Sequence, residues 1–446
     1  MSRTSLLALA FCFGLYGCVS DTVVATDAGD AGRLDSGSPL DAGSLDTGAG
    51  DTGTPMSNVT VKVINEFGGT PPNVQIRIGG QTATTDANGN ATLMAPPTYD
   101  ATLAYDSAPV STKRIVVFEG LTTRTPTLQV SIDAPRSTSF TINTMGAFPL
   151  GANDVARVVY SPSTASDDLV FAPTLASYPY SNAGWTGRDP NVGKVYAYVL
   201  TLANGLPTAW KSQASSIQSY SFGDKANVTT NLTVTPGVAT GTISGSLVRN
   251  NQFANQVWVW IAPAGDTGRM GFADMSNAAM SFSVVVPSGS VNVVGLGGVQ
   301  NSVGTFAWKA NVAPNVGGLQ LAMPASVVAL QAPAAMATNV DASTTFSWTG
   351  PFPMSRVRVV CPPTGGTYTY MVEILTPRTS LQLPNTTSLG ATLPSNAQCV
   401  WQVTSFASAA TPDEVAAPIG WIHRTDMHRA IQDGAQSTTG RPFTSK

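Results

Sequence analysis

Charged side chains are scarce in this chain. Lys, Arg, Asp and Glu together make up 11% of its 446 residues, whereas an ordinary soluble domain has about 25%. The formal net charge is −3. A nucleic-acid-binding surface needs a clustered excess of Lys and Arg to neutralise phosphates. We therefore expect no nucleic-acid partner.

Groups that could ligate a metal are also few. The two histidines, His423 and His428, are five positions apart, which places them on different faces of a helix and on opposite faces of a strand. A loop with Asp426 between them could still bring them to one metal, but we expect a surface segment and neither a metal nor a cofactor. Asp167 and Asp168 are adjacent carboxylates in a polar stretch, where we expect solvation.

Sequence motifs typical of hydrolases, metalloproteases, phosphate-binding loops and dinucleotide-binding folds are missing as well. Once the seven Asp of segment 21–54 are set aside, fifteen Asp and four Glu remain. We therefore predict no catalytic residues and no enzymatic activity. One alternative stays open: a hydrolase whose two carboxylates, ~5–9.5 Å apart, meet only in the folded chain.

An apolar run at residues 6–16 follows Arg3. It has the length of the hydrophobic region of a signal peptide and is too short for a membrane-spanning helix, which needs ~20 residues. No later run is apolar enough to span a bilayer. The sequence therefore predicts an exported protein.

The apolar run ends in Leu15, Tyr16, Gly17 and Cys18. This resembles the lipobox of bacterial lipoproteins, in which signal peptidase II cuts ahead of an acylated cysteine; Tyr16 stands where a small residue is usual. The resemblance implies that Cys18 carries a lipid and anchors the protein stably to a membrane, and we expect the outer membrane of the cell envelope. The alternative is an ordinary secretory signal whose cysteine carries no lipid.

The segment at 18–55 is rich in Asp and Gly and has no aromatic residue. Such a segment cannot bury enough apolar surface to fold, so we predict a disordered tether that is extended by its own charge repulsion. Its seven Asp and one Arg give a local charge of −6, and Arg3 contributes +1, so the rest of the chain carries +2.

From residue 56 onward, β-branched and aromatic residues alternate with polar ones in short runs, as at Val59, Val61 and Val63. Gly, Pro, Asn and Asp separate the runs. Period-two alternation of this kind predicts strands. Because a β-sandwich takes about 100 residues, we predict an all-β fold, a string of about four Ig-like or transthyretin-like β-sandwich modules.

The first of these modules resembles a known family. A turn sequence at 85–90, an apolar strand at 91–93, a Pro-Pro-x-x-Tyr corner at 96–99 and a strand at 100–105 follow one another. This order resembles the carboxypeptidase regulatory-like domains, which are small transthyretin-like sandwiches. The resemblance implies a non-catalytic accessory module.

Two further stretches indicate repetition and a second family. A comparable order recurs at 241–294, and the phrase F-x-x-K-A-N-V appears at 222–228 and again at 306–312, which indicates an internal repeat. Runs at 345–348 and 400–403 resemble strands of a fibronectin type III-like sandwich.

The predicted organisation has six parts. They are a lipoprotein signal peptide at 1–17, a disordered tether at 18–55, a regulatory-like sandwich at 56–135, a sandwich at 136–236, a regulatory-like repeat at 237–325 and a fibronectin type III-like sandwich at 326–446.

Cys361 and Cys399 are the cysteines left after Cys12 is removed with the signal peptide and Cys18 takes the lipid. Export makes a disulfide between them the expected state. Two buried free thiols are the alternative. Neither cysteine lies in a C-x-x-C motif or near a histidine, so we expect no redox or nucleophilic chemistry.

Aromatic residues are the candidates for ligand binding. Trp258 and Trp260 alternate along one predicted strand, and Tyr178, Tyr180 and Trp185 form a second group. Exposed on a sandwich face, such rings can stack against sugars. The alternative, which we favour, is that this face packs against a neighbouring module.

The sequence therefore predicts a non-catalytic, lipid-anchored cell-surface protein with a structural or adhesive role. Its expected partners are the membrane, through the N-terminal lipid, and a polysaccharide or an envelope protein. A carbohydrate-binding protein with an exposed aromatic platform is the alternative.

Overall fold

The computed structural model describes the chain from residue 55 onward, with gaps. The described ranges are 55–65, 70–107, 112–130, 135–145, 152–162, 168–172, 177–186, 191–203, 206–215, 218–236, 239–250, 256–263, 271–276, 281–300, 303–363, 369–407, 409–418 and 432–446. The signal peptide, Cys18, most of the predicted tether, Asp167 and the segment with Asp426, His423 and His428 lie outside these residues. The folded unit spans Met56–Lys446.

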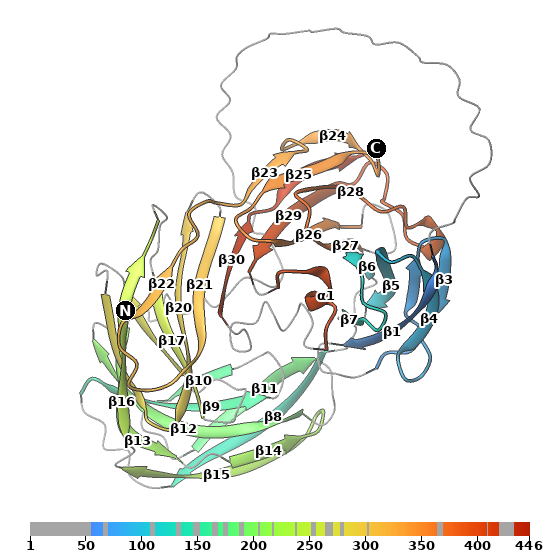
Figure 1. The fold of residues 1–446 in the computed structure, drawn as a ribbon. Coiled ribbons are helices and arrows are strands. Elements are labelled where there is room, and N and C mark those ends of the chain that lie inside the picture. The colour runs from blue at the N-terminus through green and yellow to red at the C-terminus, as the bar shows by residue number, and fades with distance from the viewer. Residues whose placement is uncertain are drawn as a thin grey trace, which may run out of the picture. The chain divides into compact units, whose positions relative to one another are not determined.

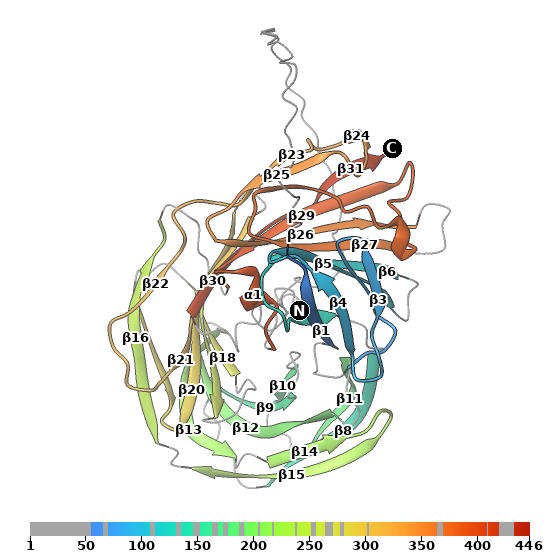
Figure 2. The same ribbon diagram turned by 45° about the vertical axis from the view of Figure 1, so that its right-hand side comes forward.

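Strands β1 to β31 make up nearly all the regular structure of the described residues (Figures 1 and 2). This confirms the predicted all-β sandwich fold. Helices there are limited to the four-residue α1 (Pro412–Val415) and the 3₁₀ turn η1 (Thr387–Leu389). No helix in the described ranges has the length and apolar character needed to cross a bilayer.

For description we divide the strands into four groups in chain order. The first group is β1 (Ser57–Asn65), β2 (Gln75–Ile78), β3 (Gln81–Thr84), β4 (Asn90–Ala95), β5 (Tyr99–Ser107), β6 (Thr112–Leu121) and β7 (Thr127–Val130). The second is β8 (Pro135–Met145), β9 (Asp154–Pro162), β10 (Asp168–Ala172), β11 (Ser177–Thr186), β12 (Asn191–Ala203), β13 (Leu206–Ser215), β14 (Gln218–Phe222) and β15 (Asn227–Pro236).

The remaining strands form two more groups. The third group is β16 (Thr240–Val248), β17 (Gln256–Pro263), β18 (Gly271–Ser276), β19 (Ser281–Pro287), β20 (Ser290–Gln300), β21 (Val303–Val312) and β22 (Leu319–Ala322). The last group is β23 (Ala329–Ala332), β24 (Ala337–Val340), β25 (Thr345–Thr349), β26 (Met354–Cys361), β27 (Thr369–Thr376), β28 (Ser380–Gln382), β29 (Gln398–Phe406), β30 (Gln432–Thr438) and β31 (Arg441–Ser445).

The first group is a sandwich whose sequence alternation matches its burial. Val59, Val61 and Val63 of β1 are fully buried, while the residues between them are exposed. One sheet has the order β4-β1-β7, and the facing strands run β3-β2-β5-β6. Ile76 and Phe118 from the second sheet pack in the same core as the valines.

The predicted turn at 85–90 forms between β3 and β4. The Asp86 Oδ1 atom accepts hydrogen bonds from the backbone N–H groups of Asn88 and Asn90, both at 2.8 Å. Gly89 has a φ of +74°, and a Cβ there would lie 2.5 Å from the Val63 carbonyl oxygen. The turn therefore requires glycine at this position.

The last group has the best-described core. Phe346, Trp348, Trp401 and Phe443 are all buried, and the Phe346 ring meets the edge of Trp401 at 5.2 Å between centroids. β26 and β29 are neighbouring antiparallel strands. A disulfide joins Cys361 of β26 to Cys399 of β29, which confirms the predicted disulfide and makes the free-thiol alternative wrong.

Parallel pairing of an early strand with the closing strand recurs in all four groups. The pairs are β1–β7, β8–β15, β16–β22 and β24–β31. In each group, the paired strands lie near the first and last residues of one predicted module. These pairs support the division into four modules, but the division and its limits stay a prediction.

Two pairings join sheets of different groups. β21 pairs with β30, and β6 pairs with β27. One sheet therefore runs β18-β17-β20-β21-β30-β29-β26-β27-β6-β5-β2-β3 through the third, last and first groups.

Replacing Cys361 and Cys399 together with serine should lower the free energy of unfolding by about 4 kcal/mol, because the disulfide closes a loop with a sequence separation of 38 residues. Urea unfolding of the double variant against the oxidised wild type measures the change. Reduced wild-type protein is the control and should behave like the variant. Equal stability of the variant and the oxidised protein would contradict the prediction.

Candidate functional site

The pairing of β6 with β27 brings together the beginning and the end of the folded sequence (Figure 1). The strands are parallel and match in seven residue pairs, from Thr112 with Thr369 to Phe118 with Leu375. Both strands are buried along most of their length. Their sequences explain this, because near-continuous apolar runs are typical of parallel strands that are covered on both faces.

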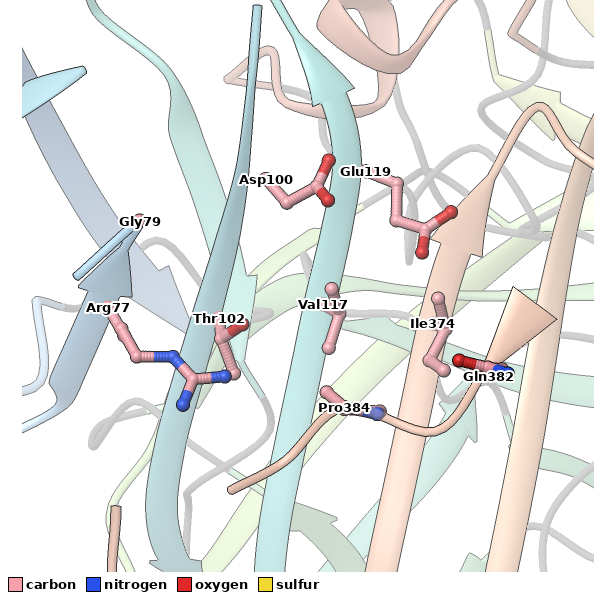
Figure 3. Close-up of a pocket in the computed structure, with 9 residues that line it drawn as sticks. All are labelled: Arg77, Gly79, Asp100, Thr102, Val117, Glu119, Ile374, Gln382 and Pro384. Carbon is pink, nitrogen blue, oxygen red and sulfur yellow. The ribbon is translucent and has the colours of Figure 1, made fainter. Parts of the chain in front are cut away.

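A pocket of about 330 Å³ opens beside this pair of strands (Figure 3). Val117 and Ile374 lie opposite each other in the register of β6 and β27, and both line it. The polar lining residues come from four strands of the first and last groups: Arg77, Asp100, Thr102, Glu119 and Gln382.

A β-bulge in β6 positions the two carboxylates of the pocket. Tyr99 pairs with Leu121 and Ala101 pairs with Phe118, so Asp100 alone faces two residues of β6. The second of these, Gly120, has a φ of +74° and donates its N–H to Asp100 Oδ1 at 2.8 Å. Bulges of this kind redirect a neighbouring side chain.

Glu119, the other bulged residue, is 8% exposed. Burial raises the pKa of its carboxyl, and the nearby charge of Asp100 adds to the increase, whereas a hydrogen bond from Thr376 and the charge of Arg378 oppose it. Its Oε2 atom accepts no hydrogen bond, and Arg378 Nε lies 3.8 Å away. The fold therefore disfavours the ionised form of Glu119.

Two further polar groups of the pocket bind neighbouring protein groups. Arg77 Nη1 donates to the Asn385 carbonyl at 2.6 Å and to Ser388 Oγ at 3.2 Å. Gln382 donates to the Ser343 carbonyl at 2.8 Å. Acid–base catalysis commonly uses two carboxylates with different surroundings, and Asp100 and Glu119 are such a pair. Here, however, Asp100 holds the bulge through Gly120. Arg77, beside them, holds the last group against the first.

A second set of polar contacts joins the same two groups through α1. Asp413 Oδ1 accepts hydrogen bonds from the backbone N–H groups of Thr122 at 2.9 Å and Thr123 at 3.1 Å, and Oδ2 accepts one from the Thr122 hydroxyl. Partial burial raises the pKa of Asp413, but these hydrogen bonds outweigh it and hold the pKa below its usual value. Just after α1, the Ala416 carbonyl accepts the N–H of Thr127 at 2.8 Å.

The sequence Thr411-x-x-Glu414 explains why the chain turns helical there. Thr411 caps the helix by accepting the Glu414 N–H at 3.3 Å, and Glu414 accepts the N–H of Ala410 at 2.8 Å. The Thr-x-x-Glu spacing is that of a capping box, although Glu414 binds the N–H of the residue before the N-cap. It fixes the helix whose first turn carries Asp413.

The aromatic candidates lie on described strands, but their side chains are outside the described residues. Trp258 and Trp260 belong to β17, where Val259 between them is fully buried. Tyr178, Tyr180 and Trp185 belong to β11. Their proposed role in ligand binding stays a prediction.

Sequence reasoning missed the residues at this junction. The capping-box pattern at Thr411 and Glu414 was the available signal for α1, and it would have pointed to Asp413 beside it. Glu119 carries no such signal, because its partners Thr376 and Arg378 are distant in the sequence, and the bulge that positions Asp100 has no sequence signal that we used. In the described ranges, no group of three or more His, Cys, Asp or Glu side chains is placed to hold a metal.

No protein-family model and no curated protein matches the chain. Solved structures match it weakly. The Bacillus anthracis TIE protein is 11% identical, with 60% of this chain and 50% of that chain covered and a TM-score of 0.16. A streptococcal ancillary pilin is 8% identical (60% and 99% covered, TM-score 0.14), and a fimbrial assembly protein from Parabacteroides distasonis is 7% identical (40% and 96%, 0.16).

The chain therefore spans half the length of the first of these structures. Several of the matched proteins are pilins or fimbrial proteins by name. TM-scores of this size do not carry any argument from those proteins to the activity of this one.

Replacing Glu119 with glutamine should raise the free energy of unfolding slightly at pH 7. The raised pKa means that an ionised Glu119 opposes folding above its folded pKa, and the amide removes that charge. The gain should shrink as the pH falls and Glu119 becomes protonated. Chemical denaturation at pH 7 and pH 4 measures it, with Asp106→Asn, at an exposed carboxylate of β5, as the control; lower stability of Glu119→Gln at pH 7 would contradict the prediction.

Proposed function

We propose that the protein is a non-catalytic, lipid-anchored cell-surface protein whose β-sandwich modules have a structural or adhesive role. The disulfide between Cys361 and Cys399 is the structural observation that carries this proposal. Disulfides persist in oxidising compartments outside the cytosol. It supports the export that the signal sequence and the lipobox-like Cys18 predict.

The junction contacts support the non-catalytic part of the proposal. An acid–base mechanism needs side chains that are free to exchange protons with a substrate. At the pocket, Asp100 holds the bulge, Arg77 binds the η1 turn, and Glu119 is buried beside Thr376 and Arg378. These groups stabilise the assembly of strands, which is the role expected in a structural protein.

The low net charge of the folded part supports binding of a partner through short-range contacts and gives no support for long-range electrostatic attraction. The part of the chain after the tether carries a net charge of only +2. Electrostatic steering needs a strong field of one sign. We therefore propose that an envelope protein or a polysaccharide binds through polar and aromatic surface groups, while the lipid on Cys18 binds the membrane.

Cys18→Ser should move the protein from the membrane fraction to the soluble exported fraction, because it removes the acylation site. Metabolic labelling with a fatty acid, followed by fractionation of the expressing bacteria, measures the change. Cys12→Ser, which alters the predicted signal peptide only, is the control and should remain labelled. If the wild-type protein is not labelled, Cys18 carries no lipid and the segment is an ordinary secretory signal.

The carbohydrate-binding alternative predicts a different loss. If Trp258 and Trp260 form a sugar platform, replacing both with alanine should weaken glycan binding about tenfold or more, since each removes a stacking surface. A glycan array and isothermal titration with the lipid-free protein measure this. Val400→Ala, at an exposed apolar position of β29, is the control. A wild-type protein that binds no glycan would remove the alternative.

A further inference from the structure

The junction between the first and last strand groups joins two parts of the chain that the sequence separates by the strands β8 to β22. We propose that it is a mechanical clasp, which passes tension from the tethered end of the chain directly to the last group, so that the chain between them carries no load while the clasp is closed. The biological source of that tension rests on the proposed surface anchoring, whereas the clasp itself does not.

Apolar packing supplies the first component of the clasp. Met354, Phe406 and Val415 of the last group are fully buried, and they pack in one core with Phe118 and the other buried residues of the first group. Burial of large apolar side chains is a main favourable contribution to association. The two groups therefore share a hydrophobic core in addition to a sheet.

Directional contacts supply the second component. The seven matched pairs of β6 and β27 add backbone hydrogen bonds along the whole contact. Asp413 binds Thr122 and Thr123 at one end of β6, and Arg77 binds the η1 turn from β2. The contacts therefore involve β2, β6 and the loop after β6, and separation of the groups requires all of them to break.

The connectivity defines the load path. The tether enters the first group at β1, and the chain leaves that group after β7 toward β8. It enters the last group at β23 and ends after β31. A force between the two ends can cross the direct contact of the first and last groups, so residues 135–322 are not stretched until that contact opens.

β1 is suited to receive this force. It pairs with β4 on one side and runs parallel to β7 on the other, matching in six and four residue pairs. A pull along β1 loads these hydrogen bonds together along the strand. The first group can therefore transmit tension to β6 and the clasp.

A cleavage experiment tests whether the clasp holds without covalent continuity. A protease recognition sequence is inserted between β7 and β8 in the full chain carrying Cys18→Ser, and the protein is cut under native conditions. We expect the two pieces to elute together in size-exclusion chromatography. Pieces that separate at once would overturn the proposal.

Matched variants test which contacts hold the pieces. Asp413→Ala combined with Arg77→Ala should speed dissociation of the cut protein at least tenfold. Asp341→Ala is the control, since Asp341 accepts three hydrogen bonds from Ser343 and Thr344 within its own loop and does not contact the first group through any of them. Equal dissociation rates for the two variants would overturn the assignment of the clasp to these contacts.

Optical-tweezers measurements on the uncut protein test the load path. With handles at position 18 and at the C-terminus, wild-type protein should show a first rupture that separates the first group from the last group while β21 stays paired with β30, followed by unfolding of the separate groups. The Asp413→Ala and Arg77→Ala variant should rupture at lower force. Extension through residues 135–322 without a preceding rupture would refute the bypass, and this outcome is independent of whether Cys18 is lipidated in cells.

Discussion

The parallel pairing of β6 with β27 is the interaction on which the rest of the described structure depends. Each of these strands also pairs on its other side, β6 with β5 and β27 with β26, so neither is an edge of the sheet. Separating them would create two edges with unpaired N–H and C=O groups and would expose the apolar surfaces of Phe118 and Leu375. The chain between β6 and β27 must therefore return so that the last group lies beside the first group.

Two carboxylates at this junction show how similar groups serve the fold in opposite ways. Asp413 accepts three hydrogen bonds from Thr122 and Thr123, so its ionised form stabilises the junction at neutral pH. That contribution is lost as the pH falls through its lowered folded pKa. Glu119 lies deeper, with only Thr376 and Arg378 to offset desolvation, and its ionisation opposes folding above its raised pKa. The charge of Glu119 therefore does not stabilise the bulge, which is held by the Gly120 conformation and the hydrogen bond to Asp100.

Local features of this fold could be predicted from the sequence, whereas the junction could not. The alternation at Val59, Val61 and Val63 gives the burial of β1, and the turn at 85–90 follows from Asp86 and Gly89, because both depend on neighbours a few residues away. The disulfide was predictable because, once Cys12 and Cys18 are assigned to the signal peptide and the lipid, Cys361 and Cys399 are the two cysteines left.

The register of β6 with β27 depends on strands far apart in the sequence, and an apolar run does not identify the strand with which it pairs. Glu119 and Arg77 acquire their partners in the last group only when the first and last groups meet, while the aromatic candidates and Cys18 remain predictions.

The scarcity of charge in the sequence acquires a structural meaning at the junction. The chain has few ionisable side chains. Three of them, Arg77, Asp413 and Asp100, form contacts that hold strands and loops in place. A catalytic site would require such groups to be free of these contacts, and freeing Arg77 or Asp413 would weaken the contact between the first and last groups. A protein that bears load between an anchor and a partner has the opposite requirement, since its polar groups must remain paired while the chain is pulled. The use of charge in the described structure is therefore compatible with the proposed structural or adhesive role.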